Sequence, residues 1–330
     1  MMNFFKYFDL IAVGDTQYDV FLELEEETKI IRDPETQRDY LGLVNAEKIP
    51  VKRVTHVPAV GNSANVAIGA SRLGLKTALY THLGNDATAK EELKVFKEEK
   101  VARDYIVFDR QRESNFTAAL NYQGERTLLV HHEPRDYTLP SLAPAEWMYY
   151  SSLAAGHEKL HGQIPSYVKK NKVKLGFNPG SHQLKEGLAV LRPILQVTHI
   201  LFLNKEESEL LLGRKGEVRE LLRGLRAEGP AIVVITDGPK GSYCDDGTHT
   251  YFLEVFQAPI VERTGAGDSY AAGFISALAY KYDIKEAMRW GTFNSASVIQ
   301  KIGAREGLLQ KHEMERVFRE NPNFQPRIFQ

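Results

Sequence analysis

The sequence predicts an α/β fold in which a mainly parallel sheet is covered by helices on both faces and carries a small β-rich appendage. From Trp147 onward, short apolar runs alternate with polar, helix-like stretches; the runs are WMYYSS, KLGFN, HILFLN and AIVVIT. Short buried strands that alternate with helices are typical of parallel sheets covered on both faces. Two polar segments, 20–57 and 103–131, show weak strand alternation and no long helical period, and they predict the appendage.

The N-terminal elements fit the same plan. Residues 8–14 form a short apolar run that ends in glycine, which indicates a buried strand. Small and apolar residues recur at helical spacing over 62–73, and a second helix is expected over 86–100. The predicted domain division is therefore an α/β core and a β-rich appendage. The core comprises 1–19, 58–102 and 132–330, and the appendage comprises 20–57 and 103–131.

Composition excludes several classes of protein. The chain has 330 residues, with 42 basic and 43 acidic side chains and a formal net charge of −1. That balance predicts no polyanion-binding surface, so nucleic acid is not an expected partner. The single cysteine, Cys244, rules out an intrachain disulfide and a cysteine-based zinc site, and it fits a reducing compartment. No run of 18 apolar residues occurs, so we expect a cytoplasmic protein without a membrane span.

The strongest local signal is the segment from Glu262 to Asp268, ERTGAGD, followed by a run of small residues. Gly265 and Gly267 allow a tight turn into a helix, whose N-terminus would suit a phosphoryl group. The positive end of the helix dipole would also hold Asp268 ionised, so that this carboxylate could act as a base towards a hydroxyl. Taken alone, Asp268 could equally be a first-turn helix stabiliser.

Dinucleotide binding is a second interpretation of this turn, because Gly265-x-Gly267 followed by Ala271 mimics that fingerprint. The segment lies far along the chain, and the carboxylate of Asp268 would repel a pyrophosphate. A Walker A motif does not occur.

Four motifs in order resemble the PfkB (ribokinase-like) family of carbohydrate kinases. They are VGNSANVA from Val60, the NKEE that begins at Asn204, the TDGPKG that begins at Thr236, and the TGAGD that ends at Asp268. The resemblance spans roughly residues 8–305. It implies a ribokinase-like three-layer sandwich with a β-sheet lid over the acceptor.

The resemblance also implies the reaction: ATP-dependent, in-line phosphoryl transfer to a hydroxyl, expected to be a primary one, of a small sugar or nucleoside. By position, Asp268 matches the catalytic base, and Gly265, Ala266 and Gly267 match the anion hole that stabilises the transferring phosphoryl group.

The nucleotide-binding residues follow from the same resemblance. Thr236, Gly238 and Gly241 match nucleotide contacts. Asn204 and Glu207 match the pair that organises the Mg²⁺–ATP complex, with Glu207 acting through water. From the residues alone, Asn204 is equally an ordinary N-cap of a helix over 205–212, and the two roles are compatible.

The acceptor-binding residues are matched by Asp19, Gly61, Asn62 and Asn65. A carboxylate such as that of Asp19 can accept hydrogen bonds from two vicinal hydroxyls. Asn65 is equally readable as a buried helix residue. Some family members bind a monovalent cation near the TGAGD motif and are activated by it. Glu262 departs from the family pattern there, so the sequence leaves open whether a cation activates this protein. Lid-to-lid dimers are common in the family, and the resemblance implies a homodimer through the lid.

Two alternatives remain at this point. One is a catalytically silent sugar- or nucleoside-binding regulator on the same fold. The other is an NAD-dependent oxidoreductase, although the first strand is not followed by the glycine-rich turn that such an enzyme needs. The identity of the acceptor and of the nucleotide donor is not readable from the sequence.

Overall fold

A computed structural model describes residues 7–25, 28–123 and 125–329. Its centre is a ten-stranded sheet. In spatial order the strands are β16 (Arg327–Ile328), β15 (Thr250–Leu253), β14 (Ser242–Asp245), β13 (Ile232–Thr236), β12 (Thr198–Asn204), β11 (Lys174–Phe177), β10 (Ala145–Tyr150), β1 (Phe8–Val13), β6 (Thr77–Gly84) and β7 (Ala102–Asp109).

The run from β13 to β7 is parallel, whereas β14, β15 and β16 add to its edge in antiparallel pairs. The mainly parallel sheet predicted from the sequence is therefore present. Because the parallel strands share one direction, their carboxyl ends and the loops that follow them gather at one edge of the sheet.

Helices cover both faces of this sheet. They are α1 (Asn62–Arg72), α2 (Ala87–Glu98), α3 (Glu158–Asn171), α4 (Ser181–Glu186), α5 (Leu188–Leu195), α6 (Lys205–Leu212), α7 (Val218–Ala227), α8 (Ala266–Ala279), α9 (Ile284–Val298) and α10 (Lys311–Glu320), with a 3₁₀ turn at Gly238–Lys240. The sheet and its helices enclose two hydrophobic cores, one on each face. Strand β10 contributes to both, because successive side chains point to opposite faces. Met148 belongs to the core that includes α3, α5 and α7, and Trp147 belongs to the core that includes α1, α8 and α9.

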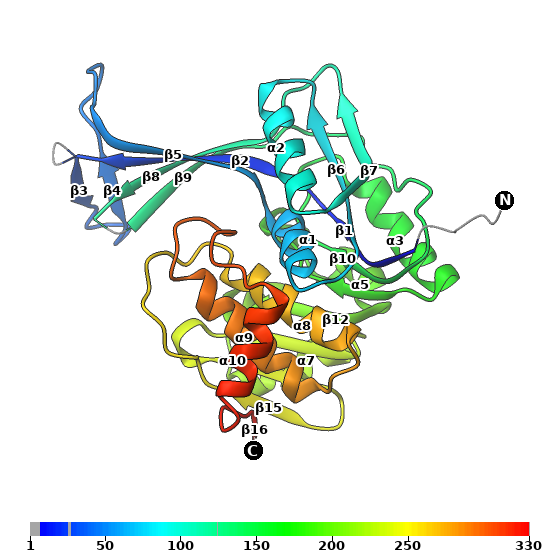
Figure 1. Ribbon diagram of the computed structural model, residues 1–330. Coiled ribbons are helices and arrows are strands. Elements are labelled where there is room, and N and C mark those ends of the chain that lie inside the picture. The colour runs from blue at the N-terminus through cyan, green and yellow to red at the C-terminus, as the bar shows by residue number, and fades with distance from the viewer. Residues whose placement is uncertain (1–6, 26–27, 124, 330) are drawn as a thin grey trace.

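A separate four-stranded sheet, called the small sheet below, has the order β5 (Val51–Val60), β2 (Gln17–Leu24), β8 (Phe116–Tyr122) and β9 (Glu125–His131). The hairpin β3 (Lys29–Arg32) and β4 (Asp39–Gly42) is paired apart from it. Figure 1 shows the small sheet as an arm that extends from the large sheet, with β3 and β4 at its far end.

The predicted boundaries of the appendage need two corrections. Strand β7, which was assigned to the appendage from residue 103, pairs with β6 at the edge of the large sheet. It follows β6 and α2 as the second strand of a βαβ unit, and its sequence alone does not reveal which sheet it joins. The small sheet also begins earlier than predicted, since β2 starts at Gln17. The sequence QGE at 123–125 predicts a turn between two strands of the appendage, and its Gly124 lies outside the described residues.

No helix among the described residues is both long and apolar enough to cross a membrane.

Candidate active site

A cavity of about 770 Å³ lies between the carboxyl edge of the large sheet and the small sheet. Its size is typical of a site for a small molecule. Every residue predicted for the site from the sequence lines it. These residues are Asp19, Gly61, Asn62, Asn65, Asn204, Glu207, Thr236, Gly238, Gly241, Gly265, Ala266, Gly267 and Asp268. The fold thus brings all the predicted residues to one place.

The N-terminus of α8 opens into this cavity. Gly265 has a φ of 74°, and a Cβ there would lie 2.5 Å from Cβ of Ala304, so the position requires glycine. A Cβ on Gly267 would meet no atom within 4 Å. The first backbone bond of the helix runs from the N–H of Ser269 to the carbonyl of Gly265, at 2.8 Å. The N–H of Ala266 donates to the carbonyl of Arg263 at 3.3 Å, whereas those of Gly267 and Asp268 are available to an anion in the cavity.

Asp268 lies in the first turn of α8 and is 8% exposed. Its Oδ2 accepts a hydrogen bond from Nδ2 of Asn65 at 2.8 Å. Burial raises the pKa of Asp268 to about 6, against the lowering effect of hydrogen bonds from Asn65 and Asn62. Burial thus opposes the ionisation that the helix N-terminus was expected to favour. A pKa near 6 still leaves Asp268 ionised at neutral pH. It also brings the pKa closer to the working pH, where a general base is most effective.

The end of the cavity that is predicted to bind the acceptor is built by the small sheet and α1. Asp19, on β2, is buried, and burial raises its pKa to about 6. Its Oδ1 accepts a hydrogen bond from Nε2 of Gln17 at 2.9 Å. Asn62, at the first turn of α1, donates through Nδ2 to Oδ1 of Asn178 at 3.2 Å and accepts from Oγ of Ser152 at 3.2 Å. These side chains form a polar wall opposite the nucleotide loop.

The end of the cavity that is predicted to bind the nucleotide is built by the segments that follow strands β12 and β13. Asn204 and Thr236 are register partners at the ends of these strands. Gly241 has a φ of 99°, and a Cβ there would lie 2.3 Å from the carbonyl oxygen of Leu253. Glycine is therefore required at the end of this loop. A Cβ on Gly238 would meet no atom within 4 Å, which leaves its backbone open to the cavity.

Asn204 and Glu207 form a capping box at the start of α6. Oδ1 of Asn204 accepts from the N–H of Glu207 at 2.8 Å, and Oε2 of Glu207 accepts from the N–H of Asn204 at 2.8 Å. The N-cap interpretation of Asn204 is confirmed. Burial raises the pKa of Glu207, and the negative charge of Asp268 raises it further. Two carboxylates that repel each other across a polar cavity, with amide oxygens nearby, suit a hard cation such as Mg²⁺.

Sequence reasoning did not single out two lining residues, Gln17 and Arg126. A third, Asn178, begins the segment NPGS after an apolar run, and that sequence fits either a pocket-lining loop or an ordinary turn. All three line the cavity. Gln17 precedes Asp19 by two positions on one strand, and that spacing alone could have placed both on one face. Arg126 comes from β9, far along the chain from the TGAGD motif, and no local pattern marks it.

Comparison with known families decides the class of this site. The model of the pfkB family of carbohydrate kinases matches residues 32–311. The chain belongs to this family. The prediction of family, and with it of a sugar or nucleoside kinase class of enzyme, is confirmed. The oxidoreductase alternative is wrong.

Relatives within this kinase family have different acceptors. Fructosamine kinase FrlD of Bacillus subtilis is 30% identical over 248 residues, which cover 74% of this chain and 84% of its own. A nucleoside kinase of Methanothermobacter thermautotrophicus is 25% identical over 327 residues, which cover 97% of this chain and 98% of its own. The structure of Arabidopsis thaliana ribokinase complexed with ribose and ATP matches with a TM-score of 0.79 at 18% identity, over 94% of this chain and 99% of that one. This likeness confirms the ribokinase-like fold. Kinases of this family use ATP with a divalent metal.

Proposed function

We propose that the protein transfers the γ-phosphoryl group of ATP to a primary hydroxyl of a small sugar or nucleoside, with Asp268 as the general base. The supporting observation is the position of the Asp268 carboxylate. It is buried in the first turn of α8 and lines the cavity that also contains Asp19 and the nucleotide loop. A base placed beside a helix N-terminus can act on a hydroxyl whose oxygen faces an incoming phosphoryl group.

In this mechanism the acceptor hydroxyl gives its proton to a carboxylate oxygen of Asp268. The hydroxyl oxygen forms a bond to the γ-phosphorus, and the bond from that phosphorus to the bridging oxygen breaks, so that ADP leaves. The N–H groups at the start of α8 stabilise the charge on the transferring phosphoryl oxygens. Asn65 holds the Asp268 carboxylate through the 2.8 Å hydrogen bond. Asn65 therefore positions the base, whereas the sequence suggested direct contact with the acceptor.

Acceptor recognition is assigned to Asp19, Gly61 and Asn62. Asp19 and Gln17 present a carboxylate and an amide side by side, which can bind two vicinal hydroxyls. Gly61 has a φ of 106°, and a Cβ there would lie 2.8 Å from the carbonyl oxygen of Asp15. The chain therefore turns sharply into α1 at this point, which brings the amide of Asn62 to the cavity.

Nucleotide binding is assigned to Thr236, Gly238, Gly241 and Asn204. Glu207 would hold Mg²⁺ through water, because this residue lines the cavity and its Oε2 is bound to the N–H of Asn204, which leaves Oε1 for the water. When bound, Mg²⁺ neutralises charge on the β- and γ-phosphates. Glu262 accepts hydrogen bonds from Arg126, Thr264 and the N–H of Gly303. These partners occupy the carboxylate, so we assign no monovalent cation to it.

We also propose that the small sheet acts as a lid over the acceptor and joins two copies of the chain. All described residues of β9 are exposed, including Leu128, Leu129 and Val130 at 48%, 55% and 54%. An exposed apolar edge strand is a liability unless another surface covers it. A second small sheet would supply that cover. Cytoplasmic localisation remains a prediction.

An acceptor panel tests the proposed reaction. Purified protein is incubated with Mg²⁺–ATP and single sugars or nucleosides; ADP release is followed, and the phosphorylated carbon is identified by NMR. The Asp268→Asn variant, purified in parallel, controls for contaminating kinases. Acceptor-dependent ADP release that is lost in this variant supports the proposal. Acceptor binding by calorimetry without ADP release would instead favour the silent regulator.

A further inference from the structure

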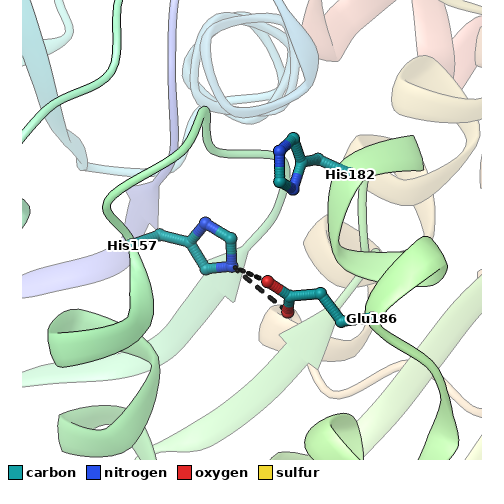
Figure 2. A group of neighbouring side chains, drawn as sticks. All are labelled: His157, His182 and Glu186. Carbon is teal, nitrogen blue, oxygen red and sulfur yellow. Dashed lines mark hydrogen bonds and ion pairs between the residues drawn. The ribbon is translucent and has the colours of Figure 1, made fainter.

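His157, His182 and Glu186 form a cluster outside the cavity described above. His157 is the N-cap residue of α3, in the segment that follows β10, and the other two lie on α4, which follows β11. Strands β10 and β11 are parallel neighbours, so the segments after their carboxyl ends meet. His182 and Glu186 are four residues apart and share one face of α4. The potential ligand atoms of the three side chains all lie within 4.8 Å of one another (Figure 2).

The hydrogen bonds of His157 define its free nitrogen. Nδ1 of His157 lies 2.8 Å from the carbonyl oxygen of Ala154, and this nitrogen must carry a hydrogen because a carbonyl can only accept. Nε2 faces the carboxylate of Glu186, 3.2 Å from Oε1 and 3.3 Å from Oε2 (Figure 2). A neutral imidazole would present a lone pair to an acceptor-only group. A metal ion between the two groups would turn this contact into a favourable one, because both Nε2 and the carboxylate can then donate lone pairs to it.

We propose that this cluster binds a zinc-class divalent ion through Nε2 of His157, a ring nitrogen of His182 and the carboxylate of Glu186. Two histidines and one carboxylate are a donor set typical of Zn²⁺ with an open fourth position. Mg²⁺ and Ca²⁺ prefer all-oxygen sites, so this ion is different from the one that accompanies ATP. The Nδ1–H bond from His157 to a backbone carbonyl is the outer contact that usually orients a metal-bound imidazole.

The separation between His157 and Glu186 fits a tetrahedral centre, and His182 lies within reach of it. Two ligands that each lie ~2.1 Å from zinc in a tetrahedron are about 3.4 Å apart. His157 Nε2 and Glu186 Oε1 already have nearly this separation, at 3.2 Å. His157 is fully buried and preorganised by Ala154, whereas His182 is exposed and can rotate to complete the set. The exposed side of His182 leaves the fourth position open to water.

Such an ion would join two loops that also reach the acceptor end of the cavity. On one side, the N–H of Ala154 donates to Oδ2 of Asp15 at 2.7 Å, and Ser152 contacts Asn62. On the other side, Asn178 lies three residues before α4 and is also bonded to Asn62. Metal bound by His157 and α4 would hold these loops together. We therefore infer that zinc stabilises the fold around the acceptor pocket without taking part in phosphoryl transfer.

Metal binding by the intact chain, with any affinity tag removed, tests the proposal. The metal-stripped protein is titrated with Zn²⁺ alone by calorimetry in a non-coordinating buffer. We expect one ion per chain, with a dissociation constant below about 10 µM. Co²⁺ is added as a spectroscopic probe to a separate sample of the metal-stripped protein, and it should give the visible absorption of a four-coordinate site, which Zn²⁺ then abolishes. Zn²⁺ should also raise the melting temperature of the metal-stripped chain.

Variants at the two accessible ligands locate the site, because substituting the buried His157 would also disturb packing. His182→Ala and Glu186→Gln should each weaken Zn²⁺ binding by at least about ten-fold and remove most of the thermal shift. His312→Ala is the matched control: His312 is also an exposed second residue of a surface helix, and its variant should bind like wild type. Absence of stoichiometric binding, or equal binding in all three variants, would overturn the site. The contact between His157 and Glu186 would then be an ordinary hydrogen-bonded pair.

Discussion

Nη1 of Arg126, on strand β9, lies 2.5 Å from Oε1 of Glu262, just before the anion hole. Oε2 of Glu262 also accepts from the N–H of Gly303 at 2.6 Å. The next residue, Ala304, packs so closely on Gly265 that no side chain fits at that glycine. Glu262 therefore connects the small sheet to the two segments that shape the start of α8. If the small sheet acts as the proposed lid, this ion pair would help to hold it over the cavity.

Breaking this connection should loosen the lid. We expect Arg126→Met to raise the KM for the acceptor by about ten-fold, because a charge-assisted hydrogen bond that holds the closed state is lost. ATP hydrolysis without acceptor should rise relative to transfer, since an open lid admits water. Steady-state kinetics with separate measurement of inorganic phosphate and phosphorylated product would check both effects.

Arg53→Met is the matched control for the lid prediction. Arg53 pairs with Glu23 at 3.2 Å within the small sheet, whereas the described ion-pair partner of Glu262 is Arg126. This variant should leave the KM and the hydrolysis ratio near the wild-type values. Equal behaviour of the two arginine variants would show that the pair with Glu262 does not hold the lid.

The second prediction concerns the base. Asp268→Asn should lower kcat by about 10²–10⁴, the usual range for a lost general base. Nucleotide affinity should change little, because the backbone N–H groups of α8 remain. The asparagine carbonyl can still accept from Asn65, so the variant should keep its fold. Stopped-flow transfer rates and nucleotide titration would measure the two quantities, and transfer within a few-fold of wild type would contradict the assignment.

The pH dependence of activity gives a third prediction. The pKa of Asp268 is raised to about 6 by burial, so kcat should be constant near neutral pH and fall as the pH drops through about 6. The fall follows from protonation of the base. A pH profile of kcat at saturating substrates would show this limb, and the residual activity of Asp268→Asn should lack it. A wild-type profile that stays flat through pH 6 would remove Asp268 from the role.

The same pKa predicts an effect on stability with a defined sign. The folded-state pKa of about 6 exceeds the ordinary value of 3.8, so the folded state binds the proton more tightly than the unfolded state does. The contribution of Asp268 to stability is therefore greatest below the ordinary pKa and is lost as the pH rises through about 6. At neutral pH, Asp268→Asn should raise the free energy of unfolding by on the order of 1–3 kcal/mol. Urea unfolding at neutral and acid pH measures this. A variant less stable than wild type at neutral pH contradicts it.

The sequence could predict those site residues whose roles depend on local geometry. Asn204 and Glu207 are three residues apart at a helix start, which is enough to indicate a capping box. Asp268 follows a glycine turn into a helix, so its place in the first turn was readable. The burial that sets its pKa was not, because that depends on Asn65 and on the cavity wall, which come from distant parts of the chain.

Sheet membership and long-range pairs also lay beyond the sequence. Strands β7 and β8 are both indicated by short runs of apolar and aromatic residues, yet one joins the large sheet and the other the small sheet. The choice depends on what the preceding helix packs against. Arg126 and Glu262 are 136 positions apart, and neither carries a local signal for the other. The boundaries of the small sheet and its contacts with the rest of the chain therefore depend on long-range packing, which no local sequence pattern predicts.

The fourth prediction concerns Mg²⁺. Glu207→Gln should raise the Mg²⁺ concentration needed for half-maximal activity and lower kcat, because the charge that orders metal-bound water is lost. Glutamine can still accept from the N–H of Asn204, so the capping box is retained. Glu206→Gln is the matched control, since Glu206 is exposed in the same first turn. If both variants give the wild-type Mg²⁺ titration, Glu207 acts only as a cap.

The final prediction concerns assembly through the small sheet. Light scattering in dilute solution should give about twice the mass of one chain, 37.3 kDa. Leu128→Lys combined with Val130→Lys should shift the population to monomer, because these side chains, at 48% and 54% exposure, would be covered by the partner copy. Val190→Lys, at an exposed apolar position on α5, is the control and should leave the dimer intact.

Hydrogen exchange separates the dimer from the lid. Amides of β2 and β8 should exchange more slowly when a true acceptor is added, while those of α8 change less, because the small sheet closes and the helix is already packed. If the double lysine variant is monomeric but still shows acceptor-dependent protection, closure does not need the partner. A wild-type monomer whose small sheet exchanges at the same rate with and without acceptor would contradict both the dimer and the lid.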